Sequence, residues 1–240
     1  TASYGSGRPI IGILGEFDAN AGISQKRKPV KEARIPGGAG HGCGHNLFGT
    51  ASLGAAIAIK EQIEKGNIKG TVIFYGTPAE ETIFAKVWMV REGLFDKLDV
   101  CMDWHPGDEI EAGTQSSKAL VDFRVKFRGS SAHASSDPWN GKSAADAMEL
   151  YTTGLNYYRE HIEPTARIHY QIEKAGDVVN VVPDYAQIWT RLRQNNRAGV
   201  DVLYERALDI AKGAALMTGT TYETKLISGI YEIQVNRTGA

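Results

Sequence analysis

The first 116 residues alternate short apolar runs with glycine-rich stretches and longer helical patterns. Three runs, at 9–15, 71–76 and 99–104, are rich in β-branched or aromatic side chains, as is typical of buried strands. Residues 47–65 and 85–94 carry apolar side chains at helical spacing, and Asn46 is the predicted N-cap of the first helix. Strands that alternate with helices predict an α/β domain with a mostly parallel sheet, whose functional residues lie at the carboxyl ends of the strands.

The pattern changes after Gly113. Residues 119–127 alternate apolar and polar side chains, which predicts a strand with one face in solvent. Long amphipathic helices are predicted at 142–161 and 200–217, and further strands at 167–173, 186–192 and 221–227. The order β-α-β-β-α-β predicts a ferredoxin-like α+β domain, in which a four-stranded antiparallel sheet carries two helices on one face.

These patterns divide the chain into three segments. Residues 1–116 are expected to form the first part of the α/β domain, 117–228 an α+β domain inserted into it, and 229–240 the start of the return. Three predicted strands with two helices are few for an α/β sheet and would leave apolar surface uncovered. We therefore expect the α/β domain to be incomplete within these residues and the native protein to continue past Ala240.

Composition and charge exclude several classes of protein. Lys and Arg number 27 against 28 Asp and Glu, and basic residues gather only at Lys26, Arg27, Lys28 and Lys31, so a nucleic-acid partner has no electrostatic support. The apolar runs are shorter than a bilayer span and the N-terminus lacks a signal pattern, so we expect no membrane partner and a cytoplasmic location. The 2 cysteines allow at most one disulfide, which argues against a disulfide-stapled scaffold.

The segment 40–46, GHGCGHN, is the first candidate for chemistry. Its glycines do not fit a phosphate-binding motif, because no Lys-Ser/Thr pair follows them. Cys43 and His45 lie two residues apart on a tight turn, where thiolate and imidazole can both bind one zinc, manganese or similar ion. The alternative is a buried cysteine and a histidine in a glycine turn.

Glu80 and Glu81 form the second candidate, directly after the predicted strand 71–76. Adjacent acids are usually solvated, but a pair at a strand end, rather than on a helix face, allows one carboxylate to bind a metal while the other acts on a water. His105 follows the strand 99–104 in the same way, although a lone histidine there is more often structural. Asp18, the glutamate pair and His105 follow three different predicted strands, so we expect them to meet at one edge of the sheet, together with Cys43 and His45.

The chain also resembles a known family. The fragments GEFDA (15–19), GHGCGHN (40–46), PAEE (78–81) and DWHPG (103–107) resemble the amidohydrolase branch of the metallopeptidases, which includes aminoacylases, hippurate hydrolases and carboxypeptidases. The likeness is greatest to the p-aminobenzoyl-glutamate hydrolase group, and it continues through segments that cover nearly the whole chain.

The resemblance implies roles for residues of the first segment. Cys43, His45, Glu81 and His105 match metal ligands of the family, and Glu80 matches its general base. Two divalent metal ions in each copy of the complete protein, zinc or manganese, are implied. Thr82–Phe84 stand where glycines are common in the family, so the loop is expected to differ, and the family's last metal-binding histidine would lie in a carboxyl-terminal stretch absent from these residues.

The resemblance also implies that residues 117–228 form a lid and dimerisation domain. His133 matches a histidine that reaches the active site of the neighbouring copy, where it stabilises the oxyanion. Asn180 and Arg193 match lid positions that meet the acyl or carboxylate end of the substrate.

Together these features predict a metal-dependent enzyme that hydrolyses the amide bond of N-acyl or N-aroyl amino acids such as p-aminobenzoyl-glutamate. A homodimer formed through the lid domain is expected, and a further possible partner is a second type of subunit. The alternative is a non-catalytic or regulatory protein that keeps the fold and the dimer interface.

Overall fold

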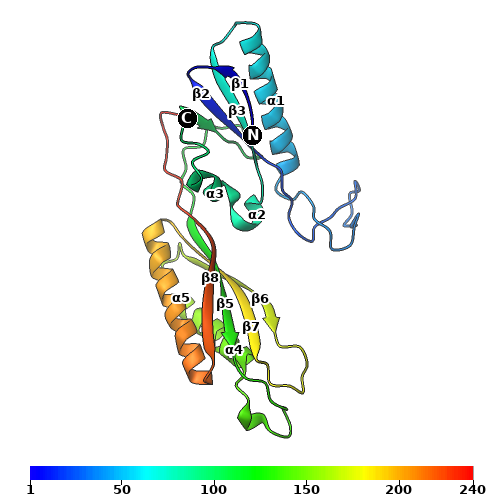
Figure 1. Ribbon diagram of the computed structural model, residues 1–240, viewed down its shortest axis with the longest axis vertical. Helices are drawn as coiled ribbons and strands as arrows, with labels where there is room; N and C mark the ends of the chain where they lie inside the picture. Colours follow the sequence, from blue (N-terminus) through cyan, green and yellow to red (C-terminus); the bar gives the residue numbers. More distant parts are fainter. Residues whose placement is uncertain (240) are drawn as a thin grey trace. The chain divides into compact units, whose positions relative to one another are not determined.

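A computed structural model describes residues 1–239. The chain divides into a first compact unit, Thr1–Glu111, and a second unit that begins at Ala112. Each unit has its own four-stranded sheet, so the prediction of a mixed α/β chain with two sheets is confirmed (Figure 1). No helix within the described residues is long and apolar enough to cross a bilayer.

The sheet of the first unit has the strand order β1-β3-β2-β4. These strands are β1 (Ala2–Ser6), β2 (Ile10–Glu16), β3 (Gly70–Thr77) and β4 (Val100–Met102). β2 runs parallel to both β3 and β4, whereas β1 is antiparallel to β3. The sheet is therefore mostly parallel, with β1 as an added edge strand that the sequence pattern does not predict.

Helices cover this sheet because each of its faces has an apolar cluster. Helix α1 (His45–Glu64) packs on one face, where Ile13, Ala56 and Val72 are buried together. Leu14, Ile73 and Tyr75 form the cluster on the other face, with side chains from helix α3 (Ala85–Arg91) and the turn after it. A third, short helix, α2 (Glu80–Ile83), precedes α3.

The start of α1 differs from the prediction. The helix begins at His45, and its N-cap is Gly44 in the left-handed conformation with φ 86°. A side chain at Gly44 would be strained in this conformation and would lie 2.9 Å from the ring of Pro106. The prediction of Asn46 as the N-cap is wrong, because the close approach of Pro106 and the backbone turn at Gly44 set the helix start.

The second unit contains a second four-stranded sheet, in the order β6-β7-β5-β8, with every pairing antiparallel. Along the chain its elements are β5 (Ala119–Arg128), α4 (Ala144–Tyr158), β6 (Arg167–Ala175), β7 (Tyr185–Gln194), α5 (Arg197–Thr218) and β8 (Thr221–Ile230). Short 3-10 helices lie at Pro138–Asn140 and Arg159–His161. The element order is β-α-β-β-α-β.

One large apolar core holds the second unit together. Alternate residues of β5, including Phe123, Val125 and Phe127, are fully buried against side chains of α4 and α5. The core includes Tyr151 of α4, and α5 contributes mostly alanines, which lets the helix lie close to the sheet. The opposite face of β5 carries polar residues such as Asp122 and Arg124, as the alternating sequence predicts. The expectation that this face lies in solvent is wrong at Asp122, which is fully buried and paired with Arg191.

Candidate metal centre

The carboxyl ends of three parallel strands bring acidic and metal-binding residues to one edge of the first sheet. Glu16 is the last residue of β2, and Asp18 follows it. The glutamate pair follows β3, and His105 follows β4. Residues with carboxylate, imidazole and thiol groups therefore meet where α1 begins, as the topology predicts.

Glu80 and Glu81 lie in the first turn of the short helix α2. The expectation that the pair avoids a helix is therefore wrong. Ala79 and Phe84, which flank this turn, both have left-handed backbones, with φ 55° and 53°. The Glu81 backbone N–H donates to Asp18 Oδ2 at 3.0 Å, so a side chain from the end of β2 anchors this turn.

His45 is buried, with 1% of its surface exposed, and Asp18 orients its ring. Nδ1 lies 3.1 Å from the backbone oxygen of Asp18 and 3.2 Å from Asp18 Oδ1. Because a carbonyl oxygen can only accept, the contact with Asp18 makes Nδ1 the donor, and Nε2 is the nitrogen directed into the centre. Nε2 faces the carboxylates, 2.8 Å from Glu16 Oε2 and 3.9 Å from both Glu80 Oε2 and Glu81 Oε1.

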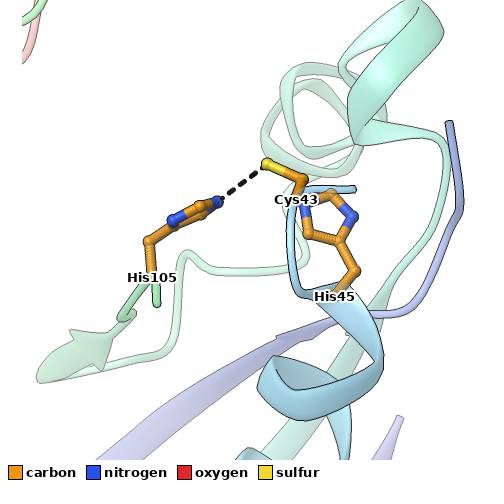
Figure 2. Close-up of side chains that lie close together, drawn as sticks. All are labelled: Cys43, His45 and His105. Carbon is orange, nitrogen blue, oxygen red and sulfur yellow. Dashed lines mark hydrogen bonds between the residues drawn. The ribbon is translucent and has the colours of Figure 1, made fainter. Parts of the chain in front are cut away.

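Cys43 and His105 face each other beside His45 (Figure 2). The Cys43 Sγ atom lies 3.1 Å from His105 Nε2, while His105 Nδ1 donates to the Pro106 carbonyl at 2.9 Å. Trp104 fixes this loop, because its indole N–H donates to Ser52 Oγ of α1 at 3.0 Å. The ligand atoms of Cys43, His45 and His105 all lie within 4.8 Å of one another.

The centre carries more negative than positive charge. Burial raises the pKa of the Cys43 thiol, and the charges of Glu81, Glu80 and Glu16 raise it further. Burial also raises the pKa of Glu80, with added effects from Glu16 and Glu81. The Lys86 ammonium forms an ion pair with Glu16 and lies 3.6 Å from Asp103. A bound cation would reverse these shifts, since it favours thiolate and carboxylate.

Buried polar atoms without hydrogen-bond partners indicate whether the residues of the centre fit a metal ion. Glu16 Oε2, His45 Nε2 and Glu81 Oε1 are buried without a hydrogen-bond partner. A divalent cation bound to such atoms would remove the cost of leaving them unpaired. Thiolate, imidazole and carboxylate are the ligands of zinc and related ions, so the residues present fit a metal.

The second unit holds His133 and Asn180 close together. His133 forms an isolated antiparallel bridge with Val181, and the Ala134 N–H donates to the Asn180 carbonyl at 3.0 Å. His133 Nδ1 accepts from the backbone N–H groups of Ser135 and Ser136, each at 3.2 Å. The neutral imidazole therefore carries its proton on Nε2, which is left to act as a donor.

Arg193 lies near the far end of β7 from these two residues. It pairs with Leu120 and Arg167, whereas Asn180 precedes the start of the strand at Tyr185. Eight residues of strand span about 27 Å, so one chain does not bring Arg193 to His133 and Asn180. The Arg193 Nε atom is buried without a hydrogen-bond partner, and burial, followed by the charge of Arg191, lowers the pKa of Arg193.

Sequence patterns do not predict that Glu16, Lys86 and Asp103 belong to the metal centre. Glu16 belongs to the fragment GEFDA, but its position directly after the apolar run 9–15 is its only signal. Lys86 has the sequence pattern of an ordinary surface lysine on a helix. Only the fold brings it to Glu16, 70 residues away along the chain.

Comparison with known proteins confirms the family resemblance. The sequence profile of peptidase family M20/M25/M40 matches residues 14–232. The chain is 44% identical to one of the subunits of p-aminobenzoyl-glutamate hydrolase from Escherichia coli, over 99% of this chain and 50% of that protein. It is 33% identical to a human Xaa-Arg dipeptidase over 91% of this chain and 47% of that protein. The chain thus spans about half the length of these relatives.

Solved structures share the fold. An aminobenzoyl-glutamate utilization protein from Klebsiella pneumoniae matches 98% of this chain and 56% of its own, with a TM-score of 0.68 at 23% identity. A dinuclear metal-binding peptidase of the M20 family from Bacillus subtilis matches 98% of this chain and 62% of its own, with a TM-score of 0.61 at 21% identity. The profile match and the identity to curated relatives establish that the chain belongs to peptidase family M20/M25/M40.

Proposed function

We propose that this chain is part of a metal-dependent hydrolase that cleaves the amide bond of N-acyl or N-aroyl amino acids, with p-aminobenzoyl-glutamate as the type of substrate. The observation that carries the proposal is the group of buried polar atoms without hydrogen-bond partners on Glu16, His45 and Glu81, next to the carboxylate of Glu80. The 44% identity to a relative named as a p-aminobenzoyl-glutamate hydrolase supports the substrate class.

Two divalent ions, zinc or manganese, are the proposed cofactors. Cys43, His45, Glu81 and His105 would hold them, and the description of an M20 structure as dinuclear supports the number. When bound, such ions lower the pKa of a water molecule and polarise the amide carbonyl.

Glu80 is proposed as the general base. Its raised pKa, caused first by burial, brings the carboxylate closer to the basicity that accepting a proton from water requires. Glu80 would then return this proton to the leaving amine. Its neighbour Glu81 is held by the bond from its own backbone N–H to Asp18, which suits a fixed ligand.

His133 is proposed to donate from Nε2–H to the oxyanion in the active site of a second copy of the chain. The two backbone N–H groups that face Nδ1 support this role, because they favour the neutral tautomer with a proton on Nε2. In this proposal residues 117–228 are the lid and dimerisation domain, and the edge strands β6 and β8 are available for pairing. Mixed dimers of inactive His133→Ala and inactive Glu80→Gln proteins should regain partial activity, and no recovery after verified exchange of the copies would contradict action in trans.

Arg193 and Asn180 are the proposed substrate-binding residues of the second unit. A carboxylate would satisfy the buried Nε–H of Arg193 with a charge-assisted hydrogen bond. Asn180 lies beside His133 in the chain's own fold, so the two would meet the same end of the substrate.

The complete protein is proposed to act in the cytoplasm as a homodimer. A second type of subunit is a further proposed partner, since two relatives, 44% and 29% identical to this chain, are named as different subunits of p-aminobenzoyl-glutamate hydrolase.

The metal-loaded complete gene product should release p-aminobenzoate from p-aminobenzoyl-glutamate. Glu80→Gln should abolish turnover with metal still bound, while Glu81→Gln should lower metal occupancy. Exchange of these two phenotypes would contradict the assigned roles. A preference for unblocked Xaa-Arg dipeptides would contradict the acyl substrate class, and two bound metals without any turnover would favour a regulatory protein.

A further inference from the structure

Glu16 is a buried carboxylate at the inner side of the metal centre, with 4% of its surface exposed. Its two oxygens have different surroundings. Oε1 forms an ion pair with Lys86, whereas Oε2 has no hydrogen-bond partner and faces His45. Oε1 is therefore held by Lys86, and Oε2 is available to bind a ligand or an ion.

Glu16 Oε2 and His45 Nε2 face each other as a pair of buried polar atoms. The two atoms are 2.8 Å apart, yet neither has a partner in hydrogen-bonding geometry, while Nδ1 of the same ring faces the Asp18 carbonyl. A cation that lies against both atoms would satisfy them together.

The separation of these two atoms suits ligands of one ion. Zinc binds imidazole nitrogen and carboxylate oxygen at about 2.0–2.2 Å with tetrahedral angles, so two ligand atoms of one ion are about 3.4 Å apart. The contact of 2.8 Å needs only a small opening to admit the ion. Ligand atoms of Glu16, His45 and Glu80 all lie within 4.8 Å of one another. This group shares His45 with the group of Cys43 and His105 but lies deeper in the unit.

We propose that Glu16 is a metal ligand, which binds through Oε2 the same ion as His45 while Lys86 holds Oε1. The inference rests on the metal centre of the proposed function and adds a residue to its ligands. In this arrangement Lys86 is a positioning residue that fixes the rotation of the carboxylate and touches neither metal nor substrate.

The competing explanation is that Glu16 serves only as the counter-ion of Lys86. The two explanations differ in what the removal of Lys86 does. If Glu16 is a ligand, Lys86→Met loosens the orientation of the carboxylate but keeps the ligand itself and removes a competing cation, so it should lower the affinity for metal much less than Glu16→Gln. If Glu16 is only a counter-ion, Glu16→Gln and Lys86→Met break the same ion pair and should have equal effects.

The test measures cobalt binding to the complete gene product by metal analysis and by competition with a chelator. The wild type is compared with Glu16→Gln, Lys86→Met and the control Glu61→Gln, whose carboxylate is exposed on α1. Glu16→Gln should weaken one cobalt equivalent by more than about 100-fold, the upper range for loss of an outer-shell partner. The thiolate-to-cobalt band of Cys43 should persist, and Lys86→Met should keep both equivalents.

Three outcomes would overturn the proposal. Wild-type affinity for every equivalent in Glu16→Gln would remove Glu16 from the ligands, and equal losses in Glu16→Gln and Lys86→Met would make it a counter-ion. A wild-type protein that binds no cobalt would refute the metal centre itself, which separates the two failures. If Glu16→Gln does not fold, a crystal structure of the metal-loaded wild type decides, with a Glu16 oxygen expected within about 2.2 Å of an ion.

Discussion

Two glycines of helix α1 test how closely this helix approaches the metal-binding end of β2. Gly49 lies against the end of β2, where a Cβ atom would be 2.5 Å from the backbone oxygen of Glu16. Gly54, one and a half turns further on, is exposed and has no atom within 4 Å of such a Cβ. Alanine at these two positions changes helix propensity equally but meets different surroundings.

The two substitutions should change stability in opposite directions. In an exposed helix interior, alanine is favoured over glycine by about 0.8–1.0 kcal/mol, so Gly54→Ala should stabilise the first unit by nearly this amount. Gly49→Ala has the same gain in helix propensity, but its methyl group would push the backbone of α1 away from the backbone of β2. Such overpacking costs about 1–3 kcal/mol. The two variants should therefore differ by about 1–3 kcal/mol, with Gly49→Ala the less stable.

Urea unfolding followed by circular dichroism measures the two free energies of unfolding, and hydrogen exchange of β2 amides assigns the change to the first unit. Metal affinity is a second readout, because Gly49→Ala displaces the strand end that carries Glu16. Equal stabilisation by both alanines, with unchanged metal affinity, would refute the close packing of α1 on β2.

Three further predictions concern charge. Asp122→Asn should destabilise the second unit by about 3 kcal/mol, because the fully buried carboxylate accepts hydrogen bonds from Arg191. Glu173→Gln should destabilise it by about 1 kcal/mol or less, because the pair of Glu173 with Arg124 is partly exposed. Equal losses of unfolding free energy in urea would contradict burial as the cause of the difference. The hydrogen bond from Arg124 lowers the pKa of Glu173 below its usual 4.5. The contribution of this pair to stability is therefore complete above that pH and is lost as the pH falls through the folded-state pKa. The unfolding free energies of wild type and Glu173→Gln should converge as the pH falls below 4.5. Chelation of bound metal should lower the thermal midpoint, since an ion at about 100 times its Kd stabilises a protein by about 2.7 kcal/mol, and an unchanged midpoint would argue against the metal centre.

Much of this architecture can be predicted because the elements carry their own patterns. The alternation in 119–127 marks β5, and the rule that parallel strands share a carboxyl edge predicts that Cys43, His45 and His105 meet. β1 escapes prediction because all five of its residues are exposed and none belongs to an apolar pattern. It becomes a strand by pairing with β3, a contact between residues about 70 positions apart.

The backbone of the glutamate turn could not be predicted for a different reason. Ala79 and Phe84 adopt left-handed conformations that residues with a Cβ rarely take, so local preferences argue against this turn. Tertiary contacts stabilise it instead, among them the hydrogen bond from the Glu81 N–H to Asp18. Strain of this kind gathers where a fold must hold side chains for chemistry, and here it fixes both members of the glutamate pair.

The register of β2 against β3 links the fold to the metal centre. Glu16 pairs with Thr77, so the two strands end level, and Asp18 can then reach both the His45 ring and the Glu81 N–H. A slip of one residue would turn Glu16 to the opposite face of the sheet, away from His45. The apolar residues of β2 would change faces in the same slip, so Ile13 and Leu14 would leave their separate clusters. The burial that selects this register for stability therefore also places the candidate ligands around His45.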